Sequence, residues 1–258
     1  MDVFAPGTLN AAALLLMRLT GLLLMAPVFS DRSVPGRVRA ALLVLLTVCL
    51  LPVAVAADPA PDLTAAAFVT EGVVGLTLGL GAAVFIAAAQ SAGDWLAVQM
   101  GLSGANVLDP HSQTQLPVVG QFMGLFVTAL IVATGGHLLM LDALASSLSA
   151  LPPGAPIDVQ AGAFAVVGTA GRIFALGLRF AAPVVAAMMV GNAVLGVMAR
   201  TVPQVNVLMV AFPVQIGIGL FTLALALPLV AAFFAGFGAE YTGVVSQTLE
   251  RFVPAGGP

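Results

Sequence analysis

The chain lacks lysine entirely and carries little charge of either sign. Its eight basic residues are all arginine, eleven residues are acidic, and only 7% of the 258 residues are charged. Soluble domains carry roughly a quarter charged residues, so a water-facing globule is excluded. The net charge of −3 also argues against a nucleic-acid-binding surface, because such surfaces need a clear excess of basic side chains.

Cysteine and histidine are nearly absent as well, with one Cys and two His in the whole chain. Cys49 lies inside an apolar run, cannot form an internal disulfide, and is best interpreted as a small core residue. The sequence shows no Cys/His metal spacing, no glycine-rich phosphate loop and no nucleophile beside a base. We therefore expect no metal, no cofactor and no enzymatic activity.

Long hydrophobic runs are what the chain has in place of charge. Hydrophobic residues make up 60% of it, and a helix needs about 20 apolar residues to cross a hydrocarbon core of about 30 Å. Six runs reach that length, which predicts an all-α polytopic membrane protein. The runs are residues 9–29, 38–57, 65–90, 121–147, 165–199 and 205–235. The tail after residue 235 is expected to be less helical, with Tyr241 and Phe252 as membrane-interface anchors.

The placement of arginine predicts an orientation. Arg32, Arg37 and Arg39 follow the first run and Arg200 follows the fifth, whereas residues 58–64 and 149–162 hold acids but no base. Because basic residues are retained on the cytoplasmic side, the loops after runs one, three and five are assigned to the cytoplasm. Both termini are then outside, although Arg251 favours the cytoplasmic side for the tail.

The joint between the fifth and sixth runs predicts a helix, a tight turn and a second helix. Pro203 has no N–H and disfavours helical backbone before it, so the incoming helix should end there. A cation at position 200 suits a helix C-terminus, and an Asn can cap the next helix. The predicted hairpin tip consists of Arg200, Thr201, Pro203, Gln204 and Asn206.

Charged and titratable residues inside apolar runs are costly, by about 2.5 kcal/mol or more at mid-membrane for a charge, and therefore need a role. Arg172 and Arg179 lie seven residues apart, on one helix face. A proton or ion path and interhelical pairing, with Glu71 or Asp142 as partners, are both open; pairing is favoured because arginine cannot release its proton. His137 is expected to be a hydrogen-bonded structural residue. The candidates are Arg18, Glu71, His137, Asp142, Arg172 and Arg179.

Three glycines predict close packing of one helix. Gly72, Gly75 and Gly79 share a helix face, and the Gly75-x-x-x-Gly79 spacing is typical of close helix approach.

Residues 91–120 form a long connection that contains no base and becomes polar from Asn106 to Pro117. An ordinary loop and a re-entrant or pore-lining segment are both compatible with this composition.

Five segments, spread in order along the chain, together resemble the FliR/SctT family of type III secretion export-gate proteins, and the resemblance extends over nearly the whole chain. The most specific piece is ARTVPQVNVLMVAFPVQIGIGL, residues 199–220. The other pieces are RLTGLLLMAPVFSDRSVPGRVRAAL (18–42), GDWLAVQMGLSGANVLDPHSQTQLPVVGQF (93–122), GGHLLMLDAL (135–144) and ALPPG (150–154).

The resemblance implies an architecture. It implies a FliP-like part over residues 1–161, followed by a FliQ-like helical hairpin and tail over residues 162–258. It also implies a pore-plugging segment that includes Asn106, Val107, Leu108, Asp109, Pro110, Leu116 and Pro117. The glycines, Glu71, Asp142, Arg172 and Arg179 become candidates for contacts or charge pairs between subunits.

The resemblance further implies a place and a task. Proteins of this family assemble with FliP and FliQ, near FlhB and FlhA, in the inner membrane within the flagellar basal body. The gate passes unfolded rod, hook and filament subunits. An injectisome export gate is the main alternative, because injectisome homologues share the fold. A small-solute transporter is less favoured, since the chain shows no convincing internal repeat.

Overall fold

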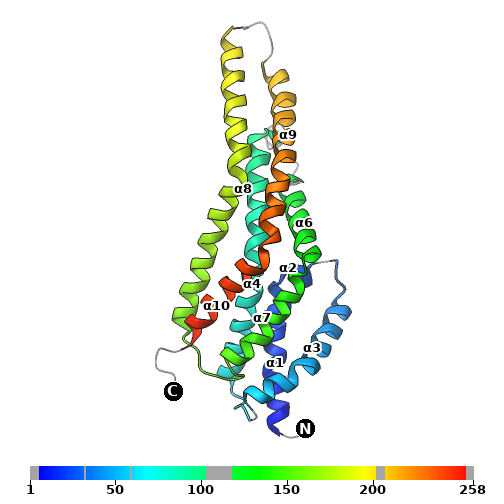
Figure 1. Cartoon of the computed structure of the whole chain (residues 1–258), viewed down its shortest axis with the longest axis vertical. Helices are drawn as coiled ribbons and strands as arrows, with labels where there is room; N and C mark the ends of the chain where they lie inside the picture. Colours follow the sequence, from blue (N-terminus) through cyan, green and yellow to red (C-terminus); the bar gives the residue numbers. More distant parts are fainter. Residues whose placement is uncertain (1–5, 32, 59, 103–117, 202–206, 254–258) are drawn as a thin grey trace, which may run out of the picture. The chain divides into compact units, whose positions relative to one another are not determined.

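The computed structural model describes residues 6–31, 33–58, 60–102, 118–201 and 207–253. Within these ranges the regular structure is helical and no strand occurs, as the sequence predicts. Figure 1 shows the helices, which are α1 (Pro6–Met25), α2 (Pro27–Ser30), α3 (Gly36–Ala57), α4 (Ala65–Gln99), α6 (Val118–Ala133), α7 (Gly136–Ala150), α8 (Val159–Thr201), α9 (Val207–Ala235) and α10 (Phe237–Phe252).

The number of long apolar helices agrees with the sequence. Of the described helices, five are long and apolar enough to cross a membrane, and there are six if the bent pair α6–α7 is one span. These helices coincide with the six runs. The predicted polytopic, all-α membrane fold is therefore confirmed.

Two of the runs are interrupted. The first stops at Met25 because Ala26, which precedes Pro27, has extended backbone, as expected for a residue before proline. The fourth divides into α6 and α7 at Gly135, whose φ of 76° lies in the left-handed region that favours glycine. A run of apolar residues therefore does not guarantee one unbroken helix.

The prediction of a connection beginning at Ser91 was wrong. Helix α4 continues to Gln99, nine residues past the predicted end of its run. Its extension packs closely on α6, where a Cβ added at Gly93 would lie 2.7 Å from the Cα of Gly120. This packing supports helix through a stretch whose polar residues suggest a loop.

The C-terminal tail differs from the expectation too. Residues 237–252 form the regular helix α10, which buries Phe237, Tyr241, Val244, Val245, Thr248, Leu249 and Phe252. These positions repeat at helical spacing. Tyr241 and Phe252 have no exposed surface, so they belong to a protein core and are not interface anchors. The Tyr241 hydroxyl donates to the Leu78 carbonyl at 3.2 Å, and burial raises the pKa of this phenol.

Side-chain caps set the starts of the two longest helices. The Thr64 hydroxyl accepts from the Ala67 N–H at 3.1 Å at the start of α4, and the Asp158 carboxylate accepts from the Ala161 N–H at 2.9 Å at the start of α8. Helix α8 ends at Thr201 and α9 begins at Val207. The predicted helix–turn–helix is confirmed in these two helices, while the turn itself, residues 202–206, lies outside the described residues.

The chain forms two compact units, each assembled from separate segments. Unit 1 contains residues 1–84, 131–171 and 236–258, and unit 2 contains residues 85–130 and 172–235. Helices α4 and α8 contribute residues to both. The predicted division at residues 161 and 162 follows chain order and family resemblance, and it stays a prediction.

The core of unit 1 is organised around α1. Its leucines at positions 15, 19 and 22 recur at helical spacing and have no exposed surface, and α1 packs against α3. A buried leucine of this kind makes several tens of close atomic contacts. In a membrane setting such contacts, together with hydrogen bonds, take the place of the hydrophobic effect as the main packing force.

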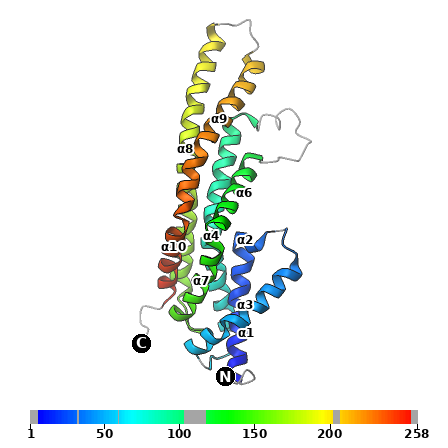
Figure 2. The same cartoon turned by 45° about the vertical axis from the view of Figure 1, so that its right-hand side comes forward.

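Unit 2 is built on the α8–α9 hairpin, whose two helices run side by side in Figures 1 and 2. Phenylalanines join its helices: the ring centroids of Phe180 and Phe233 are 5.1 Å apart, and those of Phe180 and Phe234 are 5.7 Å apart. Phe85 of α4 meets Phe234 edge-on at 6.4 Å. Aromatic pairs of this kind contribute about 0.5–1.5 kcal/mol each beyond burial.

Candidate functional site

The most highly organised polar group in unit 1 is a buried ion pair between Arg18 of α1 and Glu71 of α4. The Arg18 Nε donates to Glu71 Oε2 at 2.6 Å, and Nη2 donates to Oε1 at 3.0 Å. Both residues are 1% exposed. The arrangement is bidentate, the geometry in which an arginine–carboxylate pair is strongest.

The remaining polar atoms of the pair are satisfied by α7 and by the turn after it. Arg18 also donates to the Ser147 hydroxyl at 3.1 Å and to the Leu151 carbonyl at 2.9 Å. The Gly154 N–H donates to Glu71 Oε1 at 2.9 Å, and Gly154 has a φ of 81°. The ALPPG segment is therefore the turn that completes this charge network.

The network assigns these two buried charges a structural role. Desolvating two charges is expensive, and only good geometry with further hydrogen bonds offsets that cost. Here four segments share the pair, so it fixes the positions of α1, α4 and α7 relative to one another. Glu71 is engaged by Arg18, which supports pairing over an ion path for these two residues.

The predicted glycine face lies against α1 of the same chain. A Cβ added at Gly75 would overlap the backbone carbonyl of Arg18, and one at Gly79 would lie 2.8 Å from the Leu22 carbonyl oxygen. A Cβ at Gly72 would meet the end of the Met17 side chain at 3.0 Å. Close helix approach thus occurs within the chain, next to the buried ion pair. A role of these glycines between subunits stays a prediction.

In unit 2 the two residues that directly follow α4, Met100 and Gly101, lie against α9. A Cβ added at Gly219 would overlap the Met100 side chain. Gly101, with a φ of 74°, leaves room for Gln215, whose Oε1 would lie 3.0 Å from an added Cβ. The Gln215 amide in turn donates to Asn192 Oδ1 of α8 at 2.8 Å. We call this arrangement the α4–α9 contact; it precedes residues 103–117 directly.

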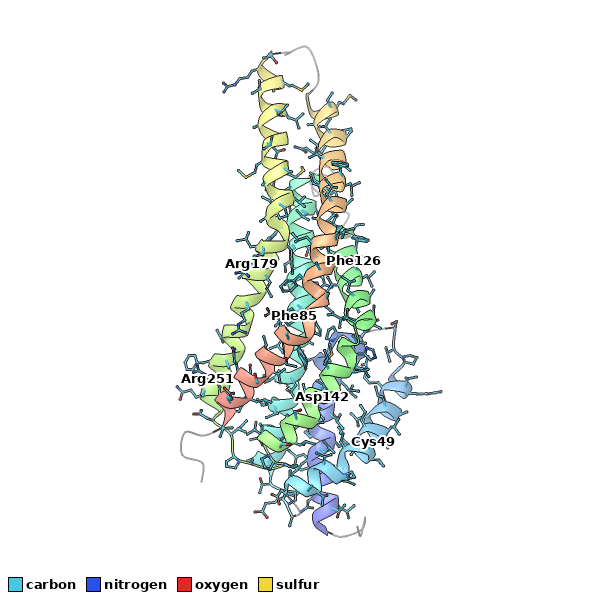
Figure 3. The ribbon with its side chains drawn as sticks, viewed as in Figure 1. Cys49, Phe85, Phe126, Asp142, Arg179 and Arg251 are labelled. Atoms are coloured by element: carbon cyan, nitrogen blue, oxygen red, sulfur yellow. The ribbon has the colours of Figure 1, made fainter. Side chains whose placement is uncertain are left out.

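The structure describes only some of the residues predicted to act together. Asp142, Arg172 and Arg179 are exposed, and no ion pair within the described ranges involves Asp142 or Arg179. Figure 3 labels Asp142 on α7 and Arg179 on α8. Among the described parts of the chain, no group of three His, Cys, Asp or Glu residues could hold a metal.

The two predicted loop sites are described only in part. Arg200 and Thr201 end α8 and are exposed. The predicted plug residues, Asn106, Val107, Leu108, Asp109, Pro110, Leu116 and Pro117, lie outside the described residues, as do Pro203, Gln204 and Asn206 of the hairpin tip.

His137 differs from the expectation of a hydrogen-bonded residue. Its Nδ1 atom is buried and finds no hydrogen-bond partner in the described part of the chain. Sequence reasoning also missed Ser147, Asn192 and Gln215 as partners in polar networks. Each of these polar residues stands out in the sequence because it lies within an apolar run. The sequence does not show which helix each side chain contacts.

The fold defines the class of protein as a polytopic helical membrane protein with a buried structural ion pair. Residues 9–240 match the family described as bacterial export proteins, family 1. The chain belongs to this family, and it is a multi-pass membrane protein.

Three similar proteins carry the name "Flagellar biosynthetic protein FliR". The protein of that name from Pectobacterium carotovorum is 32% identical over 238 residues, which are 91% of each chain. That of Escherichia coli K12 is 32% identical over 243 residues, covering 92% of this chain and 91% of the relative. That of Bacillus subtilis 168 is 31% identical over 230 residues, covering 85% and 87%.

Proposed function

We propose that this chain is a structural subunit of the flagellar type III protein export gate in the bacterial inner membrane. It forms, with FliP and FliQ homologues, the channel that passes unfolded rod, hook and filament subunits, with FlhB and FlhA homologues nearby. The observation that carries the proposal is the family match over residues 9–240, because it spans all the long apolar helices. The names of the relatives support a flagellar system over an injectisome.

The exposed surface of unit 2 supports a role in an assembly. Met209, Phe221, Leu225 and Leu229 of α9 are between 64% and 79% exposed. Apolar surface of this extent on a hairpin must be covered by lipid or by other subunits. In a multi-subunit gate, sibling helices cover a large part of it.

The polar residues fit three parts within that gate. Residues 106–117 form the plug of the closed pore, and the α4–α9 contact holds the chain that leads from α4 toward them. The hairpin tip, residues 200–206, is the surface that the FlhB homologue contacts on the cytoplasmic side. Asp142, Arg172 and Arg179 pair with charges of neighbouring subunits.

Co-assembly tests the proposal. When this chain is tagged and expressed with FliP and FliQ homologues from the same genome, we expect all three to purify together in fixed proportion from detergent. An unrelated polytopic protein of the same host, tagged in the same way, is the control. Recovery of this chain alone would contradict the proposal.

A further inference from the structure

Helices α7 and α10 of unit 1 enclose a groove with acidic ends. The two helices run in the same direction, since a Cβ at Gly136 would lie 2.9 Å from the Phe237 ring and one at Gly238 2.8 Å from Leu139. The groove has a volume of about 320 Å³. Its polar lining residues are Asp142 and Ser146 of α7 and Thr242, Ser246 and Glu250 of α10.

The floor of this acidic groove is apolar and its rim is polar. Ala143, Val245 and Leu249 are 6–7% exposed, so they contribute only a small apolar strip. Asp142 and Glu250 are exposed, as are Ser146 and Ser246 between them. Such an arrangement, with an apolar centre and a polar rim, is typical of a protein contact surface.

The two carboxylates are far enough apart to select a rod-shaped partner. Asp142 is close to the level of Thr242, and Glu250 follows Thr242 by eight residues along α10. At 1.5 Å per residue the separation is about 12 Å, or two helical turns. No basic residue is among the described residues that line the groove, so both charges are left for a partner to neutralise.

Helix α10 is an unsuitable surface for lipid chains. It is not one of the described helices long and apolar enough to span a membrane, and its outward side carries Thr242, Ser246 and Glu250. A phospholipid headgroup offers at most one cation beside an anionic phosphate, which the two carboxylates would repel. The charge pattern therefore favours a protein partner.

We propose that the acidic groove receives a helix of a sibling gate subunit that presents two basic side chains about two turns apart. Small or apolar residues between them lie on the floor of the groove. This proposal rests on the proposed function, because the partner is a member of the same export gate. The groove is then a contact between different subunits.

A second copy of this chain is the strongest competing occupant. Arg172 and Arg179 of α8 are seven residues apart, which also places two bases two turns apart on one helix. Arg172, however, already interacts within its own chain. A sibling helix with two free bases suits the groove better.

Photo-crosslinking of the tagged complex tests this. With p-benzoylphenylalanine at Ser246 and the FliP and FliQ homologues co-expressed, irradiation should give an adduct with a sibling subunit. Mass spectrometry should map it beside two Arg or Lys residues on one helix. The double variant Asp142→Asn/Glu250→Gln should lower the adduct yield about tenfold. Glu240→Gln, an exposed acid of α10 outside the groove, should leave the yield unchanged.

The outcomes separate the two proposals. Suppose first that the siblings co-purify. The groove proposal is then overturned, and the gate proposal stands, if position 246 gives no adduct or gives adducts only with lipid, with a second copy or with another protein. The same holds if the adduct yield is unchanged in the double variant Asp142→Asn/Glu250→Gln. If the siblings do not co-purify at all, the gate proposal fails and the groove proposal fails with it.

Discussion

At the scale of single residues, the buried ion pair between Arg18 and Glu71 joins α1 to α4 within unit 1. Glu71→Ala would leave a buried arginine without its counter-charge, which costs about 3–5 kcal/mol. We expect a large drop in the melting temperature of the purified protein in detergent, which differential scanning fluorimetry measures.

A matched set of variants separates charge from packing at this position. Arg18→Met/Glu71→Met removes both charges and should recover much of the lost stability, because apolar replacements avoid the desolvation cost. Arg37→Met, at an exposed position on α3, should change the melting temperature little. A Glu71→Ala protein as stable as the parent would contradict the structural role of the pair.

Sequence reasoning identified the residues of this pair but not their pairing. Arg18 and Glu71 are visible as charges inside apolar runs, and cost alone predicts that each needs a partner. Their partners come from positions 53 to 133 residues away, and a single sequence carries no signal for such distances. By the same argument, Arg172 and Arg179 were equally good candidates for the partner of Glu71, so the sequence could not select Arg18.

At the scale of elements, the α4–α9 contact gives a matched pair of glycines on one helix. Gly219→Leu would collide with Met100, whereas a Cβ at Gly217 meets nothing within 4 Å. Overpacking of this kind costs about 1–3 kcal/mol. Gly219→Leu should lower the melting temperature in detergent clearly, and Gly217→Leu should not. Equal effects of the two substitutions would count against the contact.

The segment between α4 and α6 carries the second prediction at this scale. Deleting residues 106–117 should leave co-purification with the FliP and FliQ homologues intact, because the α4–α9 contact lies outside the deletion. It should make the host membrane leak, as measured by uptake of a small impermeant dye. A deletion strain with a tight membrane and normal export would rule out the plug.

Some helix boundaries depend on side-chain packing more than on local composition. The tail 237–252 has a low apolar content, yet it is a helix because seven of its side chains are buried on one face. Helix α4 passes through its polar stretch at Ser91 because Gly93 allows close contact with α6. The interruption at Ala26 fits the preference of the residue before proline for extended backbone. Proline alone did not predict it, because other prolines lie inside helices: Pro52, Pro183, Pro213 and Pro228.

At the scale of the whole molecule, the orientation in the membrane is open to a direct test. Cys49 is exposed and is not the core residue that the sequence predicted, so Cys49→Ala must come first. In that background, Arg200→Cys should react with an impermeant maleimide only in inside-out vesicles. A single cysteine at Ser149 should react in intact cells with a permeabilised outer membrane. The reverse pattern would contradict the assignment from arginine placement.

Composition was sufficient to predict the class of the molecule, and chain order was not sufficient to predict its compact units. Six apolar runs are countable in the sequence, and the structure contains helices at each. The two units combine segments far apart in the chain, and α4, with 35 residues, and α8, with 43, contribute residues to both. Nothing in hydropathy shows how much of such a helix belongs to each unit.

The claim that this chain is a structural part of a protein export gate is tested most directly by deleting its gene and measuring export of rod, hook and filament subunits into the medium. We predict that export and filaments are lost, and that both return when the unchanged chain is supplied from a plasmid. Normal export and normal filaments without this protein would contradict the account.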